Sequence, residues 1–220
     1  MKVSTVCGTI GLALLTCGLG TARASAQAWS YPSMHHPVIM ERQFNFAVAS
    51  GGNAGTSLFA QWREGLSPTL ELDFEGGFAD PKVRDAKGRF FLGAGLALPV
   101  FAAQPNLPID FHLTGGIYPS FGDGITTVRV PFGVSLGRRL PLQNARFITP
   151  YVHPRVSLDF CSGDACDDSD ITINFDLGTD FELNRQLALR FSILIPSGAD
   201  DNAFGFSLAW KPGMLARSLR

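Results

Sequence analysis

The stretch Thr69-Leu-Glu-Leu-Asp-Phe-Glu-Gly-Gly-Phe78 decides the fold. Its large apolar side chains share one face of an extended chain: Leu70, Leu72, Phe74 and Phe78. Its acids share the opposite face: Glu71, Asp73 and Glu75. Alternation with a period of two is typical of a β-strand. Burying an unpaired carboxylate costs several kcal/mol, so the acidic face must be hydrated or ion-paired. The apolar face must be covered by another surface.

The same alternation recurs along the chain and predicts about ten strands separated by Gly, Pro, Asn and Asp clusters. They lie near 41–49, 56–64, 69–78, 89–98, 107–118, 125–136, 146–160, 170–182, 186–195 and 202–211. There is no helical pattern and no long linker, so one continuous antiparallel sheet is expected. Eight or twelve strands stay open as alternatives if a weak segment is misassigned.

Composition narrows the class of protein. The 220 residues carry 18 Lys and Arg against 19 Asp and Glu, which excludes a basic nucleic-acid-binding domain. Charged residues make up 17%, while Gly and Phe reach 24 and 18. The chain is hydrophobic and rich in glycine, and its length is that of one domain.

The first residues predict export. Lys2 precedes an uncharged stretch over 3–22, and Ala24-Ser25-Ala26 offers a cleavage site, so 1–26 is interpreted as a cleaved signal peptide. Cleavage leaves Cys161 and Cys166 as the only cysteines, and an even pair in an oxidising compartment predicts a disulfide. Beyond the leader no apolar run is long enough for a helical membrane span.

Which face of the sheet is the core decides between two architectures. A soluble sandwich or lipocalin-like barrel puts its apolar face inside. A transmembrane barrel turns that face toward lipid and must close, because no strand edge can stay unpaired there. The strands are about 9–13 residues long, and about 9–11 residues cross a bilayer at a tilt. The predicted fold is therefore all-β, a closed antiparallel up-and-down transmembrane β-barrel of about 10 strands.

The segment Gly205-Phe206-Ser207-Leu208-Ala209-Trp210 resembles the carboxy-terminal assembly signal of bacterial outer-membrane β-barrels. Gly205 is followed at alternating positions by large apolar residues, including Leu208, and by Trp210. Two departures are Ala203, where a polar residue is common, and the chain that continues after Trp210. The resemblance implies the outer membrane of a Gram-negative-type bacterium, contact with its lipid and lipopolysaccharide, and insertion by the barrel-assembly machinery.

The expected organisation is a periplasmic segment over 27–40, the barrel over 41–211 and a periplasmic tail over 212–220. The segment contains His35-His36, whose side chains would point to opposite sides with no third ligand nearby. We therefore expect a flexible periplasmic tail there and no metal site. The loop predicted at 161–169 would lie at the outer end.

A closed barrel would turn the charged face into its lumen. The acids expected to point inward are Glu71, Asp73, Glu75, Asp110, Asp159, Asp176, Asp180 and Glu182. The arginines expected to point inward are Arg63, Arg129, Arg155 and Arg190. The excess of acid fits either a scaffold held by internal ion pairs or a narrow, cation-preferring path for small solutes. A structural or passive transport role without a cofactor is the first functional hypothesis, and the oligomeric state stays open.

Two alternatives come from different classes of protein. An outer-membrane lipid or peptide hydrolase could use Ser157 as nucleophile with His153 or His112 as base. Ser157 and His153 are about 13 Å apart along an extended strand, however, which is too far for a hydrogen bond. The other alternative is a soluble periplasmic barrel that binds an apolar ligand between its Leu and Phe side chains.

Acids near the predicted disulfide provide one weak candidate for a calcium site. They are Asp164, Asp167, Asp168 and Asp170. Their spacing lacks the D-x-D-x-D-G form of a calcium loop, so no metal is expected.

Overall fold

The computed structural model describes residues 35–37, 39–52, 54–82, 87–106, 108–122, 124–163, 166–196 and 202–212. The predicted leader over 1–26 and residues 213–220 of the predicted tail lie outside these ranges, so both stay predictions. None of the helical structure in the described ranges is long and apolar enough to cross a membrane.

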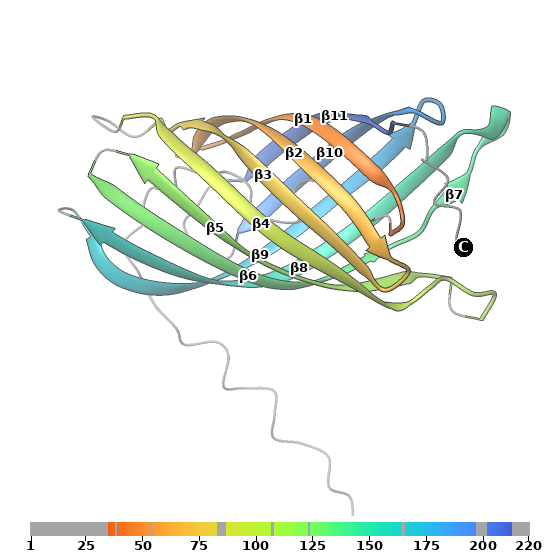
Figure 1. The fold of residues 1–220 in the computed structure, drawn as a ribbon, viewed down its shortest axis with the longest axis horizontal. Coiled ribbons are helices and arrows are strands. Elements are labelled where there is room, and N and C mark those ends of the chain that lie inside the picture. The colour runs from red at the N-terminus through yellow and green to blue at the C-terminus, as the bar shows by residue number, and fades with distance from the viewer. Residues whose placement is uncertain are drawn as a thin grey trace, which may run out of the picture.

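The structure is built almost entirely of strands (Figure 1). The strands are β1 (Arg42–Gly51), β2 (Gly55–Ser67), β3 (Leu70–Asp80), β4 (Arg89–Phe101), β5 (Asp110–Gly122), β6 (Ile125–Gly137), β7 (Leu140–Pro141), β8 (Phe147–Gly163), β9 (Cys166–Glu182), β10 (Leu187–Pro196) and β11 (Ala203–Trp210). Within the described residues one 3-10 helix, η1 (Gln143–Ala145), lies between β7 and β8.

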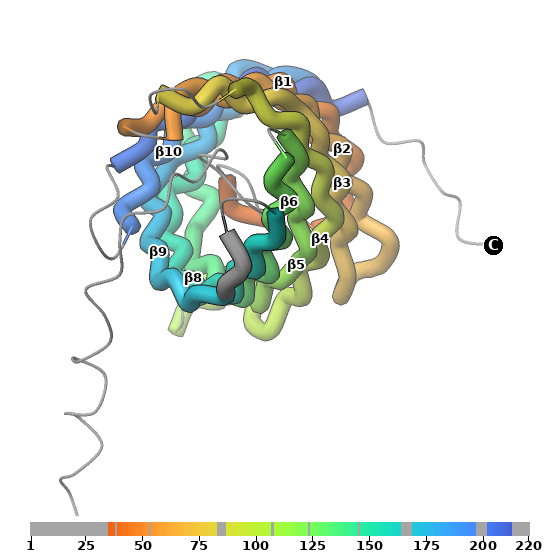
Figure 2. The backbone as a smooth tube through the Cα atoms, turned by 90° about the vertical axis from the view of Figure 1, so that its left-hand side faces the viewer, coloured from red at the N-terminus to blue at the C-terminus, as the bar shows by residue number. Residues whose placement is uncertain are grey.

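Ten of these strands close into an antiparallel up-and-down barrel, as the sequence predicts. Each strand pairs with the next along the chain, β6 pairs with β8, and β11 pairs with β1 to close the ring (Figure 2). β7 pairs only with the beginning of β8 and stands outside the ring. At the closure, the Trp210 ring stacks on Phe44 of β1 with 5.7 Å between ring centroids.

The pairing registers fix the size of the barrel. Added over the ten interfaces, they give a stagger of about 12 residues. For ten strands this stagger corresponds to a tilt of about 40° and a backbone radius of about 10 Å. We call the end where β1 begins and β11 ends the base, and the opposite end the far end.

The large apolar side chains point away from the barrel axis and lie exposed on its outer wall. On β1 and β2, for example, Phe46 and Leu58 are 63% and 61% exposed. The inward positions of the same two strands carry polar side chains that are at most 3% exposed, among them Asn45, Ser57 and Gln61. The hypothesis of a barrel with its Leu and Phe side chains around an internal ligand is therefore wrong.

The strands run further than their alternation indicates. β8 and β9 continue as one hairpin through Gly163 and Cys166, where the sequence predicts a loop over 161–169. The apolar alternation stops near Phe160 and Ile171, because beyond these residues the hairpin needs no apolar face. The ladder of backbone hydrogen bonds nevertheless continues, since it does not depend on side-chain type.

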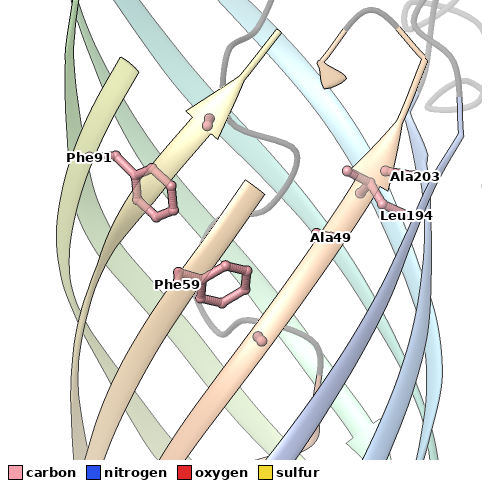
Figure 3. Close-up of a cluster of buried hydrophobic side chains, with 7 residues drawn as sticks. Ala49, Phe59, Phe91, Leu194 and Ala203 are labelled. Carbon is pink, nitrogen blue, oxygen red and sulfur yellow. The ribbon is translucent and has the colours of Figure 1, made fainter. Parts of the chain in front are cut away.

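The interior has two zones. Toward the far end, small and aromatic side chains form an apolar patch on the inner wall (Figure 3). There the rings of Phe59 and Phe91 meet at 6.0 Å between centroids, beside Ala49, Leu194 and Ala203. The rest of the interior, from the base upward, is polar and charged.

Candidate functional site: the polar lumen

Near the base, arginines pair with carboxylates on neighbouring strands. Arg63 on β2 forms a buried ion pair and hydrogen bonds with Glu71 on β3. Arg190 on β10 pairs with Asp180 on β9, with 3.2 Å between Nε and Oδ2. All four side chains are at most 5% exposed. A buried charge is tolerated only when it is paired, so each pair depends on both of its members.

Arg190 also reaches past its neighbour strand. Its Nη2 donates to Gln43 Oε1 at 2.5 Å, and its Nη1 donates to Asn45 Oδ1, both on β1. The guanidinium crosses β11, whose inward residues there are the small Ser207 and Ala209. One side chain thus links three strands across the seam where the barrel closes.

In the middle of the lumen, Asp176 on β9 binds two groups of β8. Its Oδ2 lies 3.1 Å from Arg155 Nε and 3.0 Å from His153 Nδ1. The other ring nitrogen of His153 lies 2.9 Å from Thr114 Oγ1 on β5. The His153 ring reaches β5 because the intervening β6 carries Gly133 there, where a Cβ would come within 2.6 Å of Nε2.

Asp73 and Glu75 occupy the adjacent part of the wall. Gln61 Nε2 donates to Asp73 Oδ2 at 2.8 Å and to Glu75 Oε2 at 3.3 Å. Opposite these acids, β4 carries Gly95 and Gly93. Within the described residues Asp73 forms no ion pair, and its Oδ1 has no hydrogen-bond partner. Asp73 is therefore a buried acid that pairs with none of the described cations.

Toward the far end the pairing continues. Arg129 on β6 and Asp159 on β8 form a bidentate pair at 2.7 and 2.9 Å, and Thr172 Oγ1 donates to Asp159 Oδ2 at 3.0 Å. Arg89, which sequence analysis did not place in the lumen, is buried and donates to Thr127 Oγ1 at 3.2 Å. Its inward position reduces the net acidity expected from the sequence.

The rim at the base carries a second set of pairs. Arg139 binds Glu182 through two hydrogen bonds of 2.8 Å, and Lys211 Nζ lies 2.8 Å from Glu41 Oε2. The hydrogen-bonded carboxylate of Glu182 raises the pKa of Arg139. Asp110 also lies at this end, where its Oδ1 accepts from Ala103 N at 2.8 Å instead of pointing deep into the lumen.

The hydrolase candidates do not come together as a triad around Ser157. His153 is bound to Asp176 and Thr114, and the buried Ser157 Oγ has no hydrogen-bond partner among the residues that the structure describes. His112 instead contacts the ring of His36, with 4.5 Å between centroids. Hydroxyl, imidazole and carboxylate do meet at Thr114, His153 and Asp176. Arg155 shares that carboxylate, however, and Thr114 is only 6% exposed.

The metal and disulfide candidates are only partly described. Asp164 and the side chains of Cys166, Asp167 and Asp168 lie outside the described part of the chain, while Asp170 Oδ1 caps the backbone N of Ile171 at 2.8 Å. Among the described side chains no group of three or more His, Cys, Asp or Glu could hold a metal ion. In the hairpin register Cys161 pairs with Asp168, and Cys166 with Gly163. The disulfide stays a prediction.

Sequence analysis missed the polar residues that carry no charge and the two histidines before β1. Gln43, Asn45 and Gln61 are at most 3% exposed and join the arginine and carboxylate groups to one another. The alternation of the strands places these three residues on the same face as the charged side chains, and this is the signal that could have identified them. His35 and His36, expected in a periplasmic tail, lie inside the barrel at 1% and 3% exposure. That expectation is wrong, because the imidazoles find hydrogen-bond partners in the lumen.

No protein-family model and no curated protein matches the chain. Among solved structures it is similar to the β domain of the Bordetella autotransporter BrkA, with 11% identity and a TM-score of 0.47 over 77% of this chain and 97% of that one. It is also similar to the KdgM porin (7%, TM-score 0.40, 76% and 98% covered) and to the translocator domain of the autotransporter NalP from Neisseria meningitidis (9%, TM-score 0.39, 80% and 90% covered). The function of this chain has to be inferred from its own residues.

Proposed function

We propose that the chain is an integral β-barrel of a bacterial outer membrane with a structural role, whose lumen is closed at rest. One observation carries this proposal: the outer wall is apolar around the barrel, while charged side chains are buried and paired inside it. This arrangement is the reverse of a soluble barrel and fits a lipid solvent.

The height of the apolar wall supports the membrane. On β9 the outward apolar residues run from Ile171 to Phe181, interrupted only by Thr179. At about 3.3 Å per residue and a tilt of about 40°, ten residues rise about 25 Å, which is the height of the apolar band of outer-membrane barrels. Soluble monomers rarely expose apolar patches above a few hundred Å², so lipid is the natural cover for this wall.

The state of the interior supports a scaffold. Arg63, Arg155 and Arg190 are at most 2% exposed although all three point into the lumen. In a wide water-filled pore such side chains would be solvated. Their pairing across neighbouring strands instead holds the wall together from within.

Passive passage of small cations is the second candidate, and Asp73 favours it. Its Oδ1 has no hydrogen-bond partner among the described residues, and the position opposite it on β4 is Gly95, so negative charge lies on this stretch of the inner wall. A path along it would prefer cations over anions.

The same proposal covers orientation and partners. The base would face the periplasm, since it carries both ends of the barrel. Outer-membrane lipid and lipopolysaccharide would contact the outer wall. The barrel-assembly machinery would recognise β11, whose Leu208 and Trp210 point outward. A disulfide between Cys161 and Cys166 would close the far hairpin.

The test is reconstitution into planar bilayers at pH 7.5. A protein that folds into lipid and shows no steady conductance supports the closed scaffold. Steady, cation-selective conductance that falls in Asp73→Asn supports the passive path instead. A protein that stays in the soluble fraction contradicts both candidates.

A further inference from the structure

Residues 35–37 lie inside the barrel near the base, apart from the strand that follows them (Figure 2). His35 contacts one side of the wall. Its Nε2 is hydrogen-bonded to Gln61 Oε1 at 2.7 Å, and its Nδ1 meets the Arg63 guanidinium. Both partners belong to β2, so His35 is anchored on the β2 side of the lumen.

His36 contacts the opposite side. Its Nδ1 is hydrogen-bonded to Ser135 Oγ of β6 at 2.8 Å, and its ring lies against His112 of β5 and Tyr151 of β8, at 4.5 and 6.5 Å between centroids. The ring fits because position 137 is a glycine, where a Cβ would lie 2.8 Å from the His36 ring. Two adjacent residues thus bridge the lumen from β2 to β6.

The chain enters this position through a defined turn at the base. Met40 has a φ of 75°, and Gly65 N donates to Glu41 O at 3.0 Å, which holds the turn against the end of β2. Residues 35–37 are therefore held inside the barrel by specific contacts.

We propose that His35 and His36 form an intramolecular plug that closes the lumen and that leaves it in acid, which opens a path for small ions. The proposal rests on the membrane barrel proposed above. Its physical basis is size: a barrel with a backbone radius of about 10 Å leaves only a narrow centre once the wall side chains are in place, and a segment that bridges β2 and β6 crosses it.

The charges around the two imidazoles set the direction of the pH effect. Arg63 and Arg190 face His35, together with the neutral Gln61, and Glu71 is already paired with Arg63. His112, His153, Tyr151 and Ser135 surround His36, and Arg63 acts on it as well.

A proton added to either docked ring therefore meets positive or titratable basic neighbours, while an undocked imidazole takes up a proton in water near its ordinary pKa of about 6.5. Docking is fully favourable above that pH and weakens as the pH falls below it.

The first experiment compares bilayer conductance of the full chain and of His35→Ala/His36→Ala at pH 7.5 and pH 5.0. We expect the wild type to be silent at pH 7.5 and to conduct at least tenfold more at pH 5.0, and the variant to conduct at both. Ser67→Ala/Thr69→Ala, on either side of the tip that joins β2 to β3 at the same end, is the control and should follow the wild type. A variant as silent as the wild type at pH 7.5, or a wild type without any acid response, overturns the plug.

A second measurement does not depend on current. Ser135→Cys places a thiol at the hydrogen-bond partner of His36, and a charged, membrane-impermeant thiol reagent reports its access from water. We expect at least tenfold faster labelling when His35→Ala/His36→Ala is added, and equal rates would contradict the plug. Every variant is first shown to run as a folded barrel on an unheated gel. Failure there tests the membrane barrel, whereas failure of labelling and conductance in folded protein tests the plug alone.

Discussion

Replacing Phe74 by arginine distinguishes a lipid-facing wall from a water-facing one. Phe74 lies near the middle of β3, points outward, is 45% exposed and stacks on Trp62 with 5.7 Å between ring centroids. An arginine at the bilayer midplane costs about 2–4 kcal/mol, and loss of the aromatic pair adds about 0.5–1.5 kcal/mol. Phe74→Leu keeps an apolar side chain and loses only the pair. The difference between the two variants should therefore be about 2–4 kcal/mol.

The assay is the reversible urea-dependent folding of each variant into lipid vesicles, followed by tryptophan fluorescence and by gel mobility. Phe101→Arg is the depth control, because Phe101 is the last residue of β4 and an arginine there should cost only about 0–1 kcal/mol near the interface. This variant also loses an aromatic pair, with Phe111 at 5.9 Å between ring centroids, which adds about 0.5–1.5 kcal/mol as it does at Phe74. In water, a change at an exposed position alters stability by about 0.5 kcal/mol or less. A free energy of unfolding for Phe74→Arg within that margin of Phe74→Leu would refute the lipid-facing wall.

Three further changes test the interior and the far hairpin by the same unfolding assay. Arg190→Ala leaves a buried carboxylate unpaired and should cost about 3–5 kcal/mol, and a loss below 1 kcal/mol would contradict the buried pair. Gly93→Ala puts a Cβ into the Tyr118 ring and should cost about 1–3 kcal/mol, whereas Gly115→Ala, with its nearest neighbour atom at 3.5 Å, should stay well below that, and equal losses would speak against this packing. Cys161→Ser should lower stability by about 2 kcal/mol only when the wild type is oxidised, and no redox dependence would exclude a stabilising disulfide.

The fold could be predicted from the sequence because the side-chain period of a strand is a local property. Leu72, Phe74 and Asp73 alternate in sequence and therefore alternate between lipid and lumen in the barrel. The ends of β8 and β9 could not be predicted the same way, because the hairpin near Cys161 leaves the region where one face must be apolar.

The contacts between side chains in the lumen depend on the pairing register of neighbouring strands. That register cannot be predicted from the sequence of one strand. Along β8 the acid nearest to Ser157 on the same face is Asp159, yet His153 binds Asp176, because β8 and β9 pair those two residues directly. The reach of His153 to Thr114 depends further on a glycine of a third strand.

The position of the two histidines before β1 does not follow from the local sequence. Nothing in the neighbouring sequence gives His36 a partner, because its contacts come from β5, β6 and β8, far along the chain. The site that holds the two histidines forms only when the barrel closes.

The most direct test of the central claim is the gel mobility of the protein from isolated outer membranes, before and after boiling in detergent. A closed membrane barrel resists cold detergent, so we predict a folded band that shifts to a different position on boiling. A single position under both conditions, with the protein recovered in the soluble periplasmic fraction, would contradict the account.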